Sequence, residues 1–167
     1  TRPSCPTTWS PASGPAACGS YALTSFAEYD RGLGVPTSVI GHGGEASAAT
    51  YDGFGRVTAI YLPDPDSGWI PSAIPSAQFD YFLPTDGVTP YAKIRTRNQD
   101  GASAAVSSFA ETWTYVDGLG RSLATVTQAD PTAGDAAPWI VSGLSDFDAK
   151  GNVYRAYLNE FYDGDPA

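Results

Sequence analysis

Methionine is absent from this chain of 167 residues, and histidine occurs only once, at His42. The sequence also has no Cys-x-x-Cys pair and no Gly-x-Ser-x-Gly run. A zinc site usually needs several Cys and His ligands, and a serine hydrolase needs a nucleophile elbow with a separate catalytic histidine. We therefore predict that the chain is not an enzyme, and we expect neither a metal ion nor a cofactor.

A leader and a long apolar run are missing as well. No basic-then-apolar stretch opens the sequence, position 1 is not methionine, and no apolar run approaches the length of a membrane span. We expect a processed product or an internal piece of a larger protein, with no membrane insertion by this segment.

Basic residues are scarce: Lys and Arg number 9 against 18 Asp and Glu, which gives a net charge of -9. Such a surface repels phosphate backbones and anionic lipid heads, so we expect no nucleic-acid partner. Lys93, Arg95 and Arg97 alternate along one β-prone run and would share one face of a strand. We interpret them as a solvated face or as partners for the acidic residues.

The only two cysteines, Cys5 and Cys18, lie in a lead-in over residues 1–20 that four prolines prevent from forming a helix. In an oxidising compartment they can close a small loop, which would stabilise the fold by roughly 3 kcal/mol. The sequence leaves both the disulfide and the free thiols open, because the compartment decides between them.

The rest of the chain, residues 21–167, reads as one all-β domain. Glycine and proline are spread along it, which indicates frequent turns between short strands. Residues 109–116 alternate most clearly, with Phe109, Glu111, Trp113 and Tyr115 on one face. Other β-prone runs cover residues 58–62, 78–83, 91–97, 122–127, 139–144 and 153–158. We expect loop insertions at 63–77 and 130–138, and a short helix over 102–108 is a weak candidate.

A short motif recurs along this domain. Residues 51–56 read Tyr-Asp-Gly-Phe-Gly-Arg, residues 115–121 read Tyr-Val-Asp-Gly-Leu-Gly-Arg, and residues 147–152 read Phe-Asp-Ala-Lys-Gly-Asn. Looser relatives surround Asp30, Asp80 and Asp163. The common core is Asp, two residues, Gly, and then Arg or Asn.

This spacing suits the tip of a β-hairpin. An Asp that opens a type I turn accepts backbone N–H bonds, and a Gly three positions later can take the left-handed conformation that lets the second strand pair again through a bulge. A lone hairpin is marginal in water, so several must stack. The predicted structural residues of these turns are Asp52, Gly55, Arg56, Asp117, Gly120, Arg121, Asp148 and Gly151.

These repeats resemble those of the RHS, or YD-repeat, family of large secreted bacterial proteins. The resemblance extends from about Tyr21 to Asp165. Residues 139–143 (Trp-Ile-Val-Ser-Gly), residues 147–152 and the run Arg155-Ala156-Tyr157 are similar to the RHS part of toxin-complex B-subunit and Salmonella virulence-plasmid-type proteins. Asp30 departs from the pattern because no Gly follows it at the third position, and Asn152 replaces the usual Arg.

The resemblance implies stacked antiparallel hairpins that form a curved sheet, part of a hollow shell around a toxin polypeptide. The chain would be a non-catalytic segment of that shell, secreted or at the cell surface. Its partners would be the remainder of a larger RHS chain or adjacent copies, together with the enclosed polypeptide.

Other functions are open on the same residues. Trp69, Trp113 and Trp139 could bind sugar, which would make the chain an extracellular glycan- or partner-binding module. Residues 64–68 and 163–165 carry acids that could hold calcium, although ordinary turns explain them equally well. The run Gly41-His42-Gly43-Gly44 resembles the oxyanion loop of lipases, but without an elbow we read it as a glycine-rich turn.

Overall fold

The computed structural model describes residues 25–99 and 109–167 of the chain. Cys5, Cys18 and the helix expected over residues 102–108 lie outside the described residues. In the described part, every regular element except one short 3-10 turn is a β-strand, and each strand pairing is antiparallel. The predicted all-β class with stacked hairpins is therefore confirmed.

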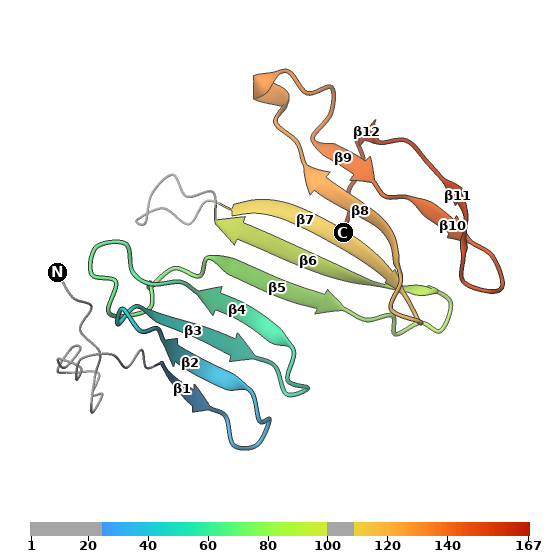
Figure 1. The fold of residues 1–167 in the computed structure, drawn as a ribbon. Coiled ribbons are helices and arrows are strands. Elements are labelled where there is room, and N and C mark those ends of the chain that lie inside the picture. Colours follow the sequence, from blue (N-terminus) through green and yellow to red (C-terminus); the bar gives the residue numbers. More distant parts are fainter. Residues whose placement is uncertain (1–24, 100–108) are drawn as a thin grey trace. The chain divides into compact units, whose positions relative to one another are not determined.

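Neighbouring strands follow one another almost in chain order (Figure 1). Ten of them hydrogen-bond in the order β1-β2-β3-β4-β5-β6-β7-β8-β9-β12, and β10 and β11 form a separate two-stranded sheet. The chain divides into two compact units, Thr1–Gln78 with Gln99–Ser108, and Phe79–Asn98 with Phe109–Ala167. The division falls inside β5, and each unit is described by itself below.

The first unit is built from short hairpins. Its strands are β1 (Phe26–Tyr29), β2 (Pro36–Ile40), β3 (Ala46–Tyr51), β4 (Val57–Tyr61) and the start of β5 (Ala77–Phe82). The core side chains Ile40, Ala46 and Ala59 are each less than a tenth exposed, and the pairing of Ile40 with Ala46 places those two on the same face. In the loop over residues 63–76, the Trp69 ring lies against Gly44.

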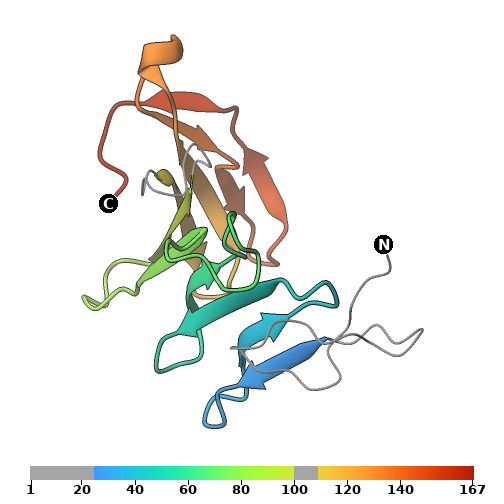
Figure 2. The same cartoon turned by 90° about the vertical axis from the view of Figure 1, so that its left-hand side faces the viewer.

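The second unit contains the rest of β5 and the strands that follow it. They are β6 (Tyr91–Gln99, of which Gln99 belongs to the first unit), β7 (Phe109–Asp117), β8 (Ser122–Gln128), β9 (Trp139–Ser142), β10 (Ser145–Phe147), β11 (Val153–Ala156) and β12 (Glu160–Tyr162). Between β8 and β9 a single 3-10 turn, η1 (Pro131–Ala133), stands out as the orange coil in Figure 2. Asp130 caps this turn by accepting bonds from the N–H groups of Thr132 and Ala133.

The core of the second unit lies on the face predicted from the alternation in residues 109–116. Trp113 is 3% exposed and pairs across the strands with Val126, which is 4% exposed. The Phe82 ring is stacked on Trp113 at 5.5 Å between centroids, and Tyr91 meets Tyr115 edge to face. Aromatic pairs of this kind add to the stabilisation that burial alone provides.

Several strands differ from the sequence expectation. The described chain has strands at 26–29, 36–40, 46–51, 145–147 and 160–162 that the β-prone runs did not include. The expected loops over 63–77 and 130–138 hold an isolated bridge between Pro63 and Pro71 and the turn η1, respectively. No helix in the described part is both long enough and apolar enough to cross a membrane.

Candidate functional site

The turn between β3 and β4 shows how the repeated motif is built. Asp52 accepts two backbone hydrogen bonds on Oδ1, from the N–H of Phe54 at 2.9 Å and from the N–H of Arg56 at 3.0 Å. The Gly55 N–H donates to the carbonyl of Asp52 at 3.0 Å, and the Asp52 N–H donates to the carbonyl of Arg56 at 2.9 Å. The carboxylate thus takes up the donors of a turn that has no helix or sheet ladder to satisfy them.

The same contacts recur at the β7–β8 turn and at the β10–β11 turn. Asp117 Oδ1 accepts from the second and fourth following residues, Leu119 and Arg121, each at 2.9 Å. Asp148 Oδ1 accepts from Lys150 at 2.9 Å and from Asn152 at 2.8 Å. Three segments of different sequence therefore form hairpin tips with the same hydrogen bonds.

The glycine of each tip takes the left-handed conformation. Gly55, Gly120 and Gly151 have φ angles of 78°, 81° and 85°. The strand pairing also shifts register by a residue beside each tip, as the sequence predicted for a bulge that follows a type I turn. A residue with a Cβ resists this φ, so the motif needs glycine there.

The arginine that follows the glycine holds the aspartate of its own tip. Arg56 places both Nε and Nη2 2.7 Å from Asp52 Oδ2, and Arg121 places the same two atoms 2.7 Å from Asp117 Oδ2. In the third tip, Asn152 donates from Nδ2 to Asp148 Oδ2 at 3.2 Å. The motif has Arg or Asn at this position. The sequence alone did not reveal that this side chain binds the Asp of its own tip.

These bonds set the pKa of the tip carboxylates. At Asp52 burial acts to raise the pKa, but hydrogen bonds from the Arg56 N–H, the Arg56 guanidinium and the Phe54 N–H outweigh it and hold the pKa below its ordinary value. At Asp117 and Asp148 the backbone N–H of Arg121 and of Asn152, respectively, is the largest cause, and it also lowers the pKa. All three carboxylates are therefore charged near neutral pH.

Successive tips touch one another within each unit. The guanidinium carbon of Arg121 lies 4.4 Å from the centre of the Phe147 ring, and a Cβ on Gly151 would come within 3.2 Å of Arg121 Nη1. In the first unit, Leu33 reaches toward Gly55, where a Cβ would lie 3.9 Å from its Cδ2. Side chains of one tip thus cover the glycine of the next.

The aromatic residue before each Asp serves a different contact at each tip. Tyr51 donates from its hydroxyl to the carbonyl of Pro36 at 2.7 Å, and Tyr115 donates to the carbonyl of Pro166 at 2.7 Å. Burial raises the pKa of Tyr115, which keeps its hydroxyl a donor. Phe147 has no hydroxyl and instead packs under Arg121.

A second kind of tip has its glycine one position later, and of its three members the sequence analysis placed only Asp30 among the looser repeats. At Asp30, Asp64 and Asp130 the left-handed glycine comes four positions after the aspartate instead of three, at Gly34, Gly68 and Gly134. Each of these aspartates accepts on Oδ1 from the second and third following N–H groups. The sequence signal for this tip is Asp-x-x-x-Gly, one residue longer than the Asp-x-x-Gly of the other tips.

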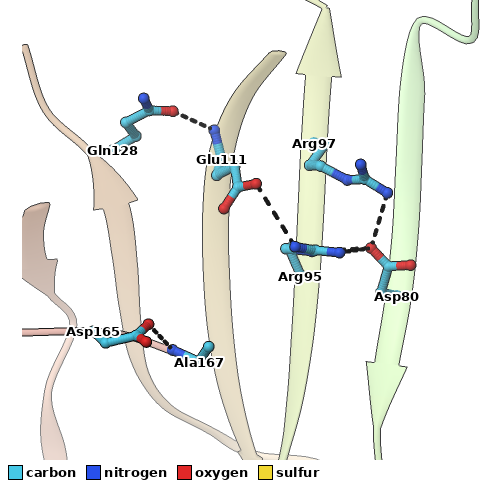
Figure 3. A network of polar contacts seen from close by, with 7 residues as sticks. All are labelled: Asp80, Arg95, Arg97, Glu111, Gln128, Asp165 and Ala167. Carbon is cyan, nitrogen blue, oxygen red and sulfur yellow. Dashed lines mark hydrogen bonds and ion pairs between the residues drawn. The ribbon is translucent and has the colours of Figure 1, made fainter.

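Asp80 is not at a tip, which corrects its assignment as a looser repeat. It lies within β5, where Arg95 Nε and Nη2 each approach its Oδ2 at 3.0 Å and Arg97 Nη2 approaches it at 3.2 Å. Figure 3 shows both arginines pointing across from β6 toward this carboxylate. The β5–β6 connection instead contains Asp86, whose carboxylate caps its own turn through Val88 and Thr89.

The ion pairs continue from Asp80 across the second unit. Arg95 Nη1 lies 3.8 Å from Glu111 Oε1 on β7, and the Glu111 N–H donates to Gln128 Oε1 on β8 at 3.0 Å (Figure 3). The Arg95 guanidinium also lies 5.5 Å from the centre of the Trp113 ring. Arg95 and Arg97 are therefore partners for acidic residues, one of the two alternatives drawn from the sequence.

The other sequence candidates occupy ordinary turns or the core. Residues 41–45 form the β2–β3 turn, in which the Gly44 N–H donates to the Gly41 carbonyl at 3.0 Å. Asp64 is engaged by its own turn, and no three His, Cys, Asp or Glu side chains come together as a metal site in residues 25–99 and 109–167. Trp113 is buried, whereas Trp69 is 51% exposed.

The described residues thus define a protein of stacked antiparallel hairpins whose tips are closed by aspartate, glycine and arginine. No family model matches the sequence, and no curated protein matches it. Among solved structures, the chain is similar to one in the crystal structure of TcdB2-TccC3, with a TM-score of 0.59 and 17% sequence identity. The match covers 82% of this chain and 8% of that chain, and at this identity it shows a shared fold.

Proposed function

We propose that the chain is a non-catalytic segment of a larger RHS-type, toxin-complex-like shell that encloses a polypeptide. The observation that carries the proposal is the triple recurrence of one Asp-x-x-Gly tip in a fold similar to part of TcdB2-TccC3. The tip carboxylates are fixed by N–H groups and, at two tips, by a guanidinium. Their contacts suit a role in holding hairpins in register.

Strands with an open edge support a larger assembly. Among the described residues of the first unit, β1 has a hydrogen-bonded neighbour, β2, on one side only, and three of its four residues are exposed. In the second unit all four residues of β11 are exposed, including Tyr154 at 72%, and Leu158 beyond it is 93% exposed. Open strand edges and exposed apolar side chains favour pairing with further chain, so we infer that neighbouring hairpins of a longer protein or adjacent copies cover them.

The proposed role also sets a location and a partner. A shell of this kind would be secreted or displayed at the cell surface, and its enclosed partner would be a polypeptide. The similar chain is much longer than this one, since the match covers only 8% of it. Enclosure would then depend on the whole parent protein.

A protection experiment tests this function. The natural protein would be isolated with an antibody raised against this chain and digested with trypsin, with and without prior opening in urea. We expect a polypeptide that resists trypsin until urea is added, inside a protein several times longer than 167 residues. A natural protein of this length alone, or one without a protected fragment, would overturn the proposal.

A further inference from the structure

The loop between β4 and β5 is a built structure with its own hydrogen bonds. The Asp64 N–H donates to the carbonyl of Ile70 at 2.8 Å, and the Gly68 N–H donates to the carbonyl of Asp64 at 2.7 Å. The carbonyl of Gly68 in turn accepts from the N–H of Ala46, at the start of β3, at 3.1 Å. Long ordered loops that are held in this way often carry binding surfaces.

This loop presents an indole ring to solvent. Trp69 is 51% exposed and the adjacent Ile70 is 56% exposed, although the six-membered ring of Trp69 lies against Gly44. Gly44 has a φ of 92°, and a Cβ there would overlap the indole. The turn between β2 and β3 therefore fixes the ring while leaving about half of it open, so little conformational entropy remains to be lost on binding.

The two segments that meet at the ring are acidic in sequence. The β2–β3 turn and the β4–β5 loop contain Glu45, Asp64 and Asp66, and neither segment contains Lys or Arg. The Glu45 carboxylate lies over Gly41 and Gly43 of the turn on which Trp69 also rests. A backbone hydrogen bond from Ser67 lowers the pKa of Asp64, so that this carboxylate stays charged in mildly acidic solution.

We propose that Trp69 and Ile70, with the carboxylates of Glu45 and Asp66, form a docking surface for a lysine- or arginine-bearing segment of a partner polypeptide. A cation over the face of an indole is attracted by the ring quadrupole, and neighbouring carboxylates add to that attraction. Ile70 provides apolar surface for the methylene stem of a long basic side chain. This complementarity of charge favours a basic peptide over a neutral sugar. The inference stands apart from the proposed shell function, which makes no use of this loop.

Fluorescence anisotropy with a fluorescein-labelled decapeptide of alternating Lys and Gly tests the surface. We expect Trp69→Ala to weaken binding at least about fivefold, although it removes no charge, and Trp69→Phe to weaken it less. Glu45→Gln should also weaken binding. The matched control, Glu160→Gln, makes the same charge change on β12 and should leave the affinity within about twofold.

The outcomes separate the proposal from general attraction to an acidic protein. An affinity that is the same for Trp69→Ala as for the natural chain, with circular dichroism showing both folded, overturns the proposal. The same conclusion follows if Glu160→Gln weakens binding as much as Glu45→Gln does. Binding of chitohexaose that depends on Trp69, without binding of the lysine peptide, would make the surface a sugar site and overturn the proposal as well.

Discussion

Arg121 and Phe147 connect two hairpin tips that are separated by more than twenty residues. The guanidinium carbon of Arg121 lies 4.4 Å from the centre of the Phe147 ring while its Nε and Nη2 hold Asp117. One side chain therefore closes its own turn and covers the aromatic residue that opens the next. Guanidinium groups suit both tasks because they are planar and present several donors in a fixed fork.

We therefore predict that Arg121→Lys destabilises the fold even though the charge is kept. Lysine can pair with Asp117 at one point, but it cannot stack flat on Phe147 while doing so. A double-mutant cycle with Phe147→Leu in urea unfolding should give a coupling of about 0.5–1 kcal/mol. As the control, Arg56→Lys combined with Phe147→Leu should be additive, since Arg56 contacts the Phe54 ring instead. A zero coupling for Arg121 would contradict the predicted contact.

The β7–β8 turn offers two glycines that differ in backbone conformation alone. Gly120 has a φ of 81°, Gly118 is outside the left-handed region, and a Cβ at either one would meet no atom within 4 Å beyond its two neighbours in the chain. Gly120→Ala should therefore lower the free energy of unfolding by about 1 kcal/mol or more, and Gly118→Ala should change it little. Urea unfolding of both variants checks this. Equal effects would mean that the left-handed conformation is not what the motif requires.

The sequence was informative where the chemistry is local. An Asp with a Gly three positions later closes its turn through groups only four residues apart, so the three tips could be located from the sequence. Asp80 was misassigned because an aromatic residue before an aspartate also occurs inside a strand, and the glycine that defines a tip is missing there. Its partners Arg95 and Arg97 follow 15 and 17 residues later in the sequence, and only strand pairing brings them close.

Strands without a strong pattern were also missed. Residues 46–51 are rich in alanine and serine, which have little β-propensity of their own, and their place in the sheet comes from pairing with β2 and β4. The position of Trp69 could not be predicted either, because its contact with Gly44 is between two separate loops. Long-range contacts of this kind leave no local periodicity in the sequence.

Gly44 and Gly68 provide a matched test of the contact between Gly44 and the Trp69 ring. Both glycines have positive φ angles, 92° and 70°, but a Cβ at Gly44 would overlap the Trp69 ring, whereas a Cβ at Gly68 would meet no atom within 4 Å outside its two neighbours in the chain. Gly44→Ala should therefore destabilise the protein more than Gly68→Ala does, and it should expose residues 63–76 to proteolysis. Thermal unfolding and limited digestion with chymotrypsin measure the two effects. If both variants behave alike, the ring contributes nothing to holding the loop.

The tip and turn carboxylates predict how stability depends on pH. Hydrogen bonds from the Thr89 N–H and hydroxyl and from the Val88 N–H lower the pKa of Asp86 to about 2 in the folded protein, and the pKa values of Asp52, Asp117 and Asp148 are also lowered. A carboxylate whose pKa is lower in the folded state than in the unfolded chain stabilises the fold above its unfolded pKa of about 3.9. That contribution is lost as the pH falls through the folded pKa.

We therefore expect the melting temperature to change little from these groups between pH 7 and about 5, and then to fall from about pH 4 to pH 2. Asp86→Asn keeps an oxygen that accepts the bonds from Val88 and Thr89 but cannot titrate. Its melting temperature should thus fall less over the same interval than that of the natural chain, and Asp66→Asn, in a turn where Asp64 is the capping acceptor, is the control. Parallel curves for the natural chain and Asp86→Asn would show that this carboxylate gains no stabilisation from its charge, because the linkage requires protonation to differ between the folded and unfolded states.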